Sequence, residues 1–264
     1  MYSGNSVYPM SRRVALVLAA ASVAALAGCD GAVGAKMTFD DTEKTKVTDI
    51  VLDGGGSGDV TVTTGNLTET RIKRIVRGGN GSGPTYQLAG TTLTLPGDCG
   101  FNCHISYEVE APTGVKVRGS IRSGSVTLSD VGAVDLTLTS GDVLIDGASA
   151  PVKVRATSGE VTISRAPGVT LEATSGSVTA REISGPVDAR VTSGELDLEL
   201  STPASVTAEV SSGDLNLTVP EGSYRINQRT ASGDAEIDGV TNDPKSPNVL
   251  DLRARSGNLT VSTR

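Results

Sequence analysis

The chain has 264 residues, a formal net charge of −7 and an aromatic fraction of only 3%. This length is enough to bury a hydrophobic core in one or two domains. A hydrophobic fraction of 37% is too high for a disordered chain, and the acidic balance argues against nucleic acid as a partner. With a single histidine, much acid–base and nucleophile chemistry is difficult to build.

Residues 1–28 are expected to be an export signal. Arg12 and Arg13 precede an apolar run at residues 14–26, which is shorter than the roughly 20 residues that cross a bilayer as a helix. A basic start, a short apolar run and small residues after it are typical of a secretory signal. These features predict export across the cytoplasmic membrane.

The signal ends in Leu26-Ala27-Gly28-Cys29, which resembles the lipobox of bacterial lipoproteins. The resemblance implies cleavage before Cys29, lipidation of its thiol and acylation of its new amine. The alternative is an ordinary signal with a chance cysteine. Two acyl chains would anchor the protein stably to the cytoplasmic membrane, which is the cell surface in a single-membrane envelope. Residues 29–45 are then a lipidated tether.

Residues 46–116 are expected to form an irregular β region. Its strand candidates, separated by loops rich in glycine and asparagine, are residues 46–52, 59–63, 70–76, 91–95 and 104–110. The run Ser57-Gly58-Asp59-Val60 matches the Ser-Gly turns of the second half. This match is consistent with a first coil that an insertion separates from the others.

Two further cysteines, Cys99 and Cys103, lie four residues apart in a turn-forming segment. Nearby cysteines in an exported protein usually pair, and the glycine and asparagine between them permit the required tight turn. The alternative is a metal or haem site that uses the adjacent His104. Zinc needs four ligands, and no second histidine or third mature thiol is free to supply them. We therefore expect a structural disulfide and neither metal nor cofactor.

Residues 117–264 contain a repeat, continuous with residues 46–116 as one domain. The dipeptide Ser-Gly recurs at spacings of 17 to 20 residues, with one final spacing of 24. The residues seven before, two after and four after each glycine are all apolar, and mostly polar residues separate them. The repeated serines are Ser123, Ser140, Ser158, Ser175, Ser193, Ser212, Ser232 and Ser256. This alternation predicts two half-buried strands per repeat with a turn between them.

Two architectures fit this repeat. In a β-solenoid each repeat is one coil and equivalent strands stack in parallel, whereas in a meander each Ser-Gly is a hairpin tip. The nearly constant period favours an all-β solenoid of about eight coils, preceded by the irregular β region. The last coil of the sequence is expected to be the open end, protected against edge pairing by Arg253, Arg255 and Arg264.

Two columns of polar residues recur with the same period as the Ser-Gly repeat. Opposite charges alternate four residues before the glycine, at Arg155, Glu172, Arg190, Glu209 and Arg229, which predicts ion pairs between stacked coils. Chance alternation on a solvated face is the alternative.

The second column lies directly after the glycine and is mostly acidic. Its carboxylates either form a divalent cation ladder or cap the turns by accepting backbone N–H bonds, and we favour capping. The candidate cation-binding residues are Asp142, Glu160, Glu195, Asp214 and Asp234.

The order of motifs along residues 47–263 resembles the bacterial domain family of unknown function 4097, whose members are called "putative adhesins". The resemblance implies a β-solenoid on an envelope protein and supplies no catalytic residues. It is carried by the repeated Ser-Gly coils and by Ile50-Val51-Leu52, Gly58-Asp59-Val60-Thr61-Val62 and Tyr107-Glu108-Val109-Glu110-Ala111-Pro112-Thr113-Gly114-Val115.

We therefore expect a non-catalytic binding or adhesion scaffold outside the cytoplasmic membrane, with an envelope or extracellular partner of unknown identity. One alternative is a structural protein that self-associates through the open end of the solenoid. A polysaccharide-active enzyme is disfavoured because Tyr224 is the only aromatic residue from residue 118 onward and the acids follow the repeat.

Overall fold

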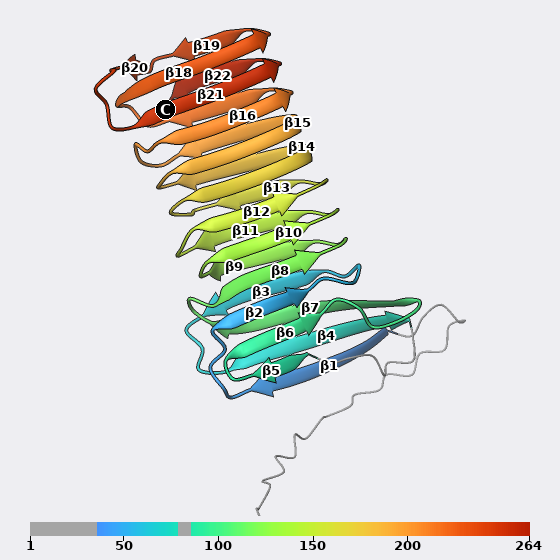
Figure 1. Ribbon diagram of the computed structural model, residues 1–264. Helices are drawn as coiled ribbons and strands as arrows, with labels where there is room; N and C mark the ends of the chain where they lie inside the picture. Colours follow the sequence, from blue (N-terminus) through green and yellow to red (C-terminus); the bar gives the residue numbers. More distant parts are fainter. Residues whose placement is uncertain (1–35, 79–85) are drawn as a thin grey trace, which may run out of the picture.

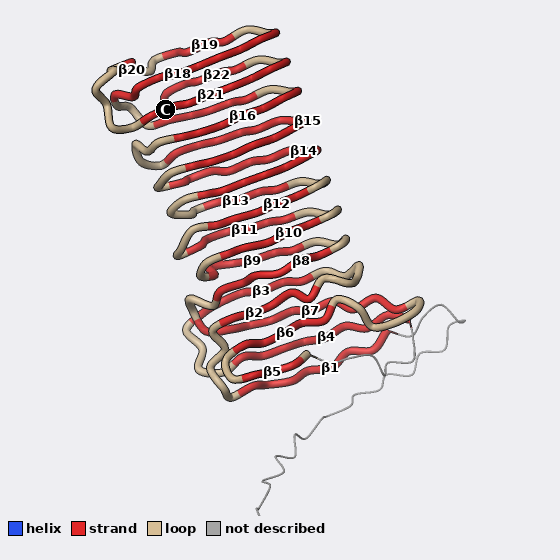
Figure 2. Tube along the Cα trace, in the orientation of Figure 1, coloured by secondary structure: helices blue, strands red, loops and turns tan. Residues whose placement is uncertain are grey.

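The computed structural model describes residues 36–78 and 86–264, in which every regular element is a strand (Figures 1 and 2). The strands stack into an elongated body with β1 (Lys36–Glu43) at one end and β19 (Ala235–Asp238) at the other (Figure 1). The described residues contain no helix long and apolar enough to cross a membrane. The expected signal peptide and Cys29 lie outside the described residues.

The middle of the stack is a β-solenoid, as the repeat predicts. Equivalent strands of successive coils pair in parallel and in register, with Val134 beside Val152 and Val143 beside Val161. A meander would pair neighbouring strands antiparallel, so the hairpin alternative is wrong. These coils are built from β8 (Lys116–Ile121), β9 (Val126–Val131), β10 (Val134–Leu138), β11 (Val143–Ala148), β12 (Val152–Ala156), β13 (Val161–Ser164), β14 (Val169–Ile183), β15 (Val187–Leu200), β16 (Val206–Ser212) and β17 (Leu215–Val219).

The Ser-Gly dipeptides form a bend at one side of each coil. Gly176 has a φ of +123°, which L-residues rarely adopt, and it lies beside Gly194 of the next coil. A Cβ at Gly176 would overlap the carbonyl oxygen of Gly159 in the coil before. In β14 and β15 the strand continues through this bend, so the turn expected between two strands is there a kink within one strand.

The core of the solenoid is a narrow column of aliphatic side chains enclosed by the strands of the stacked coils. In the coil at β13, Val161 and Ile163 are fully buried, and the next coils place Val178, Ala180 and Leu196 beside them. Each fully buried aliphatic side chain contributes about 1.5–3 kcal/mol. Small and branched side chains fit the narrow space between the sheets, which accounts for the scarcity of aromatic residues.

The N-terminal region contains two further coils. One is formed by β2 (Asp49–Asp53) and β3 (Val60–Gly65), which pair in parallel with β8 and β9. The other is formed by β6 (Thr92–Pro96) and β7 (Cys103–Pro112), which pair in parallel with the far edges of β2 and β3. The first coil that the sequence suggested is therefore present, and it lies second in the stack.

Antiparallel strands close this end of the stack. The strand β4 (Thr70–Gly78) pairs with β7, β1 pairs with β4, and β5 (Gln87–Ala89) pairs with β6. The expected tether at residues 29–45 is therefore wrong for Lys36–Glu43. Polar residues alternate there with Met37 and Phe39, which pack against the core and give the segment its strand pattern.

The C-terminal coils are stacked out of sequence order. The strands β21 (Val249–Ser256) and β22 (Leu259–Thr263) pair with β16 and β17 on one side. On their other side they pair with β18 (Ser223–Ser232) and β19, and the short β20 (Thr241–Asn242) pairs with the start of β18. The open end is therefore the coil of β18 and β19, and the expectation that the last coil of the sequence forms it is wrong.

The core-facing residues explain this inversion. In β21 they are Leu250, Leu252 and Ala254, which are all buried. In β18 the two positions beside Leu252 and Ala254 carry Gln228 and Thr230. Burying polar side chains without hydrogen-bond partners costs free energy, whereas burying aliphatic ones is favourable. The strand β21 therefore occupies the inner position in the stack and β18 the outer one.

Candidate binding site at the open end of the solenoid

The structure places Cys99 and Cys103 in a disulfide, with their Cα atoms 5.5 Å apart. Both cysteines pack against the core beside the start of β7. The Nδ1 atom of His104 lies 2.8 Å from the Ser57 hydroxyl, a contact that ties this loop to the neighbouring coil. These residues therefore stabilise the N-terminal coils.

The acidic column after the glycines is occupied by hydrogen bonds between coils. The Asp142 carboxylate accepts a bond from the Glu160 N–H at 3.0 Å, and the Asp214 carboxylate accepts one from the Asn258 N–H at 2.8 Å. Glu195 accepts a bond from the Asn216 side chain. Within residues 36–78 and 86–264, no three acids, histidines or cysteines are grouped as metal ligands. The contacts of Asp142 and Asp214 are those of turn capping, whereas Glu195 bonds a side chain of the neighbouring coil.

The alternating charge column forms one of the expected ion pairs between coils, Arg155 with Glu172 at 3.1 Å. Arg190 pairs instead with Asp188 on its own strand. Glu209 pairs with Arg255, which the inverted order of the last coils brings beside it. Exposed pairs of this kind contribute at most about 1 kcal/mol each, so the column affects register more than stability.

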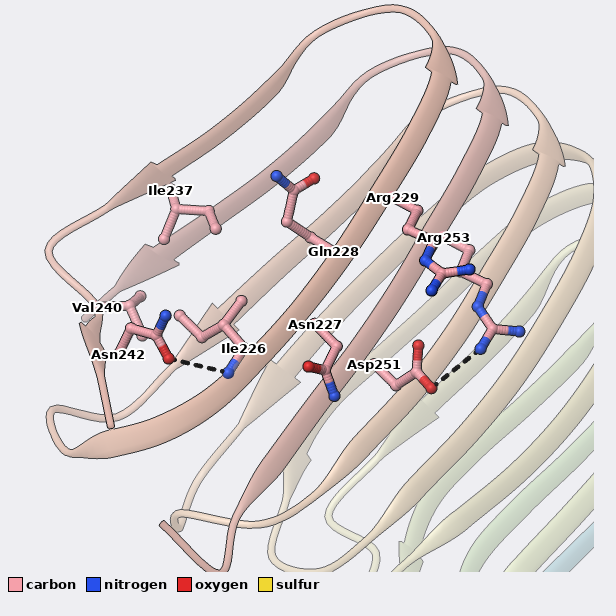
Figure 3. Close-up of a pocket in the computed structure, with 9 residues that line it drawn as sticks. All are labelled: Ile226, Asn227, Gln228, Arg229, Ile237, Val240, Asn242, Asp251 and Arg253. Carbon is pink, nitrogen blue, oxygen red and sulfur yellow. Dashed lines mark hydrogen bonds and ion pairs between the residues drawn. The ribbon is translucent and has the colours of Figure 1, made fainter. Parts of the chain in front are cut away.

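The open end carries a hollow of about 720 Å³ that runs over the free edge of β18. Ile226, Gln228 and Ile237 line its inner side, and Asn227 and Arg229 lie on the outer side of the strand (Figure 3). Val240, Asn242, Asp251 and Arg253 complete the lining. Ile237 is 37% exposed although it lies beside the fully buried Val261. The hollow is thus the uncovered end of the core.

Comparison with known proteins places this architecture in a family. The family model described as Toastrack DUF4097 matches residues 120–262, which is more than half of the chain. The chain belongs to the Toastrack family. This confirms the resemblance that the Ser-Gly repeat suggested. Comparison with curated proteins gave no match.

Several solved structures are similar to this Toastrack chain. A "putative adhesin" from Bacteroides fragilis is 13% identical, with a TM-score of 0.41 and coverage of 89% of this chain and 100% of that chain. A "putative adhesin" from Parabacteroides merdae is 14% identical, with a TM-score of 0.46 and coverage of 87% and 96%. A "putative adhesin" from Parabacteroides distasonis is 12% identical, with a TM-score of 0.35 and coverage of 88% and 98%.

Arginines line the outer side of β18 at the open end of the Toastrack solenoid. Arg253 pairs with Asp251 at 3.2 Å, whereas Arg225 and Arg229 have no carboxylate within 4.0 Å among the described residues. A second hollow of about 690 Å³ is also lined by Arg229, Arg253 and Arg255. The outward face of β18 is therefore locally basic on a chain whose net charge is −7, whereas β19 of the same coil carries the exposed acids Glu236 and Asp238. Such a site attracts carboxylates.

Side-chain hydrogen bonds fix the loops on either side of β18. Tyr224 is fully buried and its hydroxyl donates a hydrogen bond to the Pro220 carbonyl at 2.9 Å. Burial raises the pKa of this phenol. The Ser246 hydroxyl donates to the Ser223 carbonyl at 2.7 Å, which fixes the connection to β21. The residues of the hollow are therefore presented by an ordered coil.

The lining of the hollow combines aliphatic, amide and arginine side chains, which can bind a ligand. Its lining includes one carboxylate, Asp251, and this group is paired with Arg253. Glycoside hydrolysis by two carboxylates requires a second acid in the same groove. Sequence reasoning missed Gln228 and Arg229 as members of a site. The signals that could have found them are the final spacing of 24 residues and the polar Gln228 and Thr230 in apolar columns.

Proposed function

We propose that this Toastrack protein is a lipid-anchored, non-catalytic binding scaffold outside the cytoplasmic membrane, which engages an envelope or extracellular partner through the coil of β18 and β19. The export signal and the lipobox at Cys29 support the anchor. The single paired carboxylate of the hollow supports a role without catalysis. The family, which has no activity in its description, is consistent with this role.

One observation carries the proposal, namely that the two ends of the stack differ. The strand β1 begins at Lys36, seven residues after Cys29, and lies at the closed end (Figure 1). Seven residues reach at most about 25 Å, so a lipid on Cys29 holds the closed end near the membrane. The ten coils of the described part are separated by nine spacings of about 4.8 Å, so the coil at the open end lies roughly 43 Å from the first coil.

The anchor is tested with the full chain expressed in its source cells. We expect labelled palmitate to be incorporated into the wild-type chain and not into a Cys29→Ala variant, which should leave the membrane fraction. A Cys29→Ala variant that is labelled and sedimented like the wild type would overturn the anchor.

The binding end is tested by placing a photo-crosslinking residue at position 229 or at position 118. Arg118 is a matched control because it is exposed on β8, a strand that is paired on both edges. We expect a distinct crosslinked product from position 229 alone. Equal products from both positions, or a product from position 118 only, would overturn the assignment of the open end.

A further inference from the structure

The closed end of the solenoid shows how this fold covers the edge of a terminal coil. The outward residues Glu108 and Glu110 of β7 lie directly opposite Lys73 and Arg71 of the antiparallel β4. The ion pairs measure 2.9 Å for Lys73 with Glu108 and 3.4 Å for Arg71 with Glu110. The edge of an acidic coil strand is therefore covered by an added strand whose outward side chains are basic.

The open end presents the same kind of edge with the opposite charge. The outward side chains of β18 are Arg225, Asn227 and Arg229. In the stacked column, Glu209 lies beside Arg253 and Arg253 lies beside Arg229, so the column ends on two adjacent arginines. A carboxylate in the next strand would restore the alternation that the rest of the column follows.

The backbone of β18 is available for an additional strand. Arg225 N–H donates to the Asn248 carbonyl at 2.8 Å, on the side of β21. Because successive N–H groups of a strand point to alternate sides, those of Gln228 and Thr230 point to the free edge. The Asn242 side chain already accepts a bond from the Ile226 N–H on that edge at 3.2 Å (Figure 3). The free stretch of this edge, which is the part without a hydrogen-bonded neighbour, therefore begins after Ile226.

We propose that the open end accepts an extended segment of another protein as an added β-strand, with acidic side chains alternating with apolar ones. The acids face the outward side chains of Asn227 and Arg229 in the free stretch, and the apolar side chains cover Gln228 and Ile237 in the hollow. This inference rests on the proposed function, since it names the chemistry of the partner at the same end. Main-chain hydrogen bonds supply affinity in such strand addition, and the alternate side chains supply specificity.

The segment is assigned to another protein because residues 1–35 and 79–85, which lie outside the described residues, do not have the required acids. Residues 1–35 carry a single acid, Asp30, and residues 79–85 carry none. A second copy is also disfavoured, because antiparallel pairing of two β18 strands about Asn227 places Arg225 opposite Arg229. Pairing of two open ends would also put the two lipid anchors at opposite ends of the dimer.

The inference is tested by binding of a fluorescent peptide of alternating valine and glutamate to the full chain purified in detergent. A peptide of alternating valine and lysine controls for charge, and a block-ordered valine–glutamate peptide controls for alternation. We expect saturable binding of the alternating acidic peptide only. Equal binding of the block-ordered peptide, or no binding of the acidic peptide, would overturn the proposal.

Variants locate the site. We expect Arg229→Glu to weaken binding of the acidic peptide about tenfold, since an attractive cross-strand pair becomes repulsive. The same variant should gain affinity for the lysine peptide, which an unfolded variant could not do. Arg118→Glu should bind like the wild type. Thr230→Pro removes a free-edge N–H, which edge strands tolerate, and should also weaken binding.

The outcomes separate this inference from the proposed function. An acidic peptide that binds equally well to wild-type and Arg229→Glu chains would overturn the strand inference. A chain that sediments as a dimer, and as a monomer after Arg229→Glu, would overturn it in favour of a second copy. A crosslinked product at position 229 without peptide binding would leave the scaffold intact and refute the added strand alone.

Discussion

The stacked glycines of the Ser-Gly bends are the most sensitive positions in the solenoid, and Gly176→Ala tests this. Gly176 has a φ of +123°, and an added Cβ would overlap the Gly159 carbonyl oxygen of the coil before. An L-residue held in such a conformation costs about 1–3 kcal/mol. Overpacking against a backbone that must shift costs about 1–3 kcal/mol more. We therefore expect the free energy of unfolding to fall by about 2–6 kcal/mol.

Two other glycines separate these contributions. Gly90 has a φ of +62° but nothing within 4 Å of an added Cβ, so Gly90→Ala should cost only about 1–2 kcal/mol. Gly65 has neither a positive φ nor a neighbour within 4 Å, and Gly65→Ala should leave stability unchanged or raise it by about 0.4–1 kcal/mol.

The assay is urea unfolding of the three variants and the wild type, followed by far-ultraviolet circular dichroism. The midpoint and the slope of each transition give the free energy of unfolding. A loss at Gly176 that only equals the loss at Gly90 would refute the role of the stacking contact. No loss at Gly176 would refute the geometry of the bend itself.

Three further predictions concern the disulfide, the acidic column and the buried tyrosines. Replacing Cys99 and Cys103 by serine should lower the free energy of unfolding by about 2 kcal/mol in urea melts, the loop-entropy value for a separation of four residues; an unchanged midpoint would contradict this. The thermal midpoint should be insensitive to EDTA and to added calcium, because the Asp214 carboxylate already accepts a backbone hydrogen bond, and a calcium-dependent rise would instead support a cation site. Burial raises the pKa of Tyr86 and Tyr107 above the ordinary value of about 10. The unfolded chain therefore loses these protons at a lower pH than the native state does. The free energy of unfolding should not depend on these two groups below pH 10 and should fall above pH 10. Phenolate absorbance should then appear together with unfolding, and ionisation of these two tyrosines in the folded protein would contradict the burial.

The regular part of the fold could be predicted from the sequence because its signals are local and repeated. The apolar residues around each Ser-Gly specify which side of each strand is buried, and their constant spacing specifies parallel stacking. Val134, Val152 and Val169 lie in one column of the sequence and in one column of the structure. The disulfide of Cys99 and Cys103 could likewise be predicted, because a turn over four residues brings the Cα atoms close enough for the two sulfur atoms to bond.

The two ends could not be predicted in the same way because their strand order depends on long-range competition for the core. At the N-terminal end, β6 and β7 lie closer to the end of the stack than β2 and β3, although they come later in the sequence. The motifs of these two coils also lack a regular spacing. At the C-terminal end, Leu252 and Gln228 compete for the buried slot. To predict which of the two strands is buried, one must know which coil is terminal, and the spacing of the repeat does not give this information.

The open end itself is the central element of this account. Residue-resolved amide hydrogen exchange of the full chain, with and without the alternating acidic peptide, tests it most directly. We predict fast exchange at Gln228 and Thr230 in the free protein, slow exchange at Leu252 and Ala254, and new protection at Gln228 and Thr230 when the peptide binds. Slow exchange at Gln228 and Thr230 in the free protein, or no change on adding the peptide, would contradict the account.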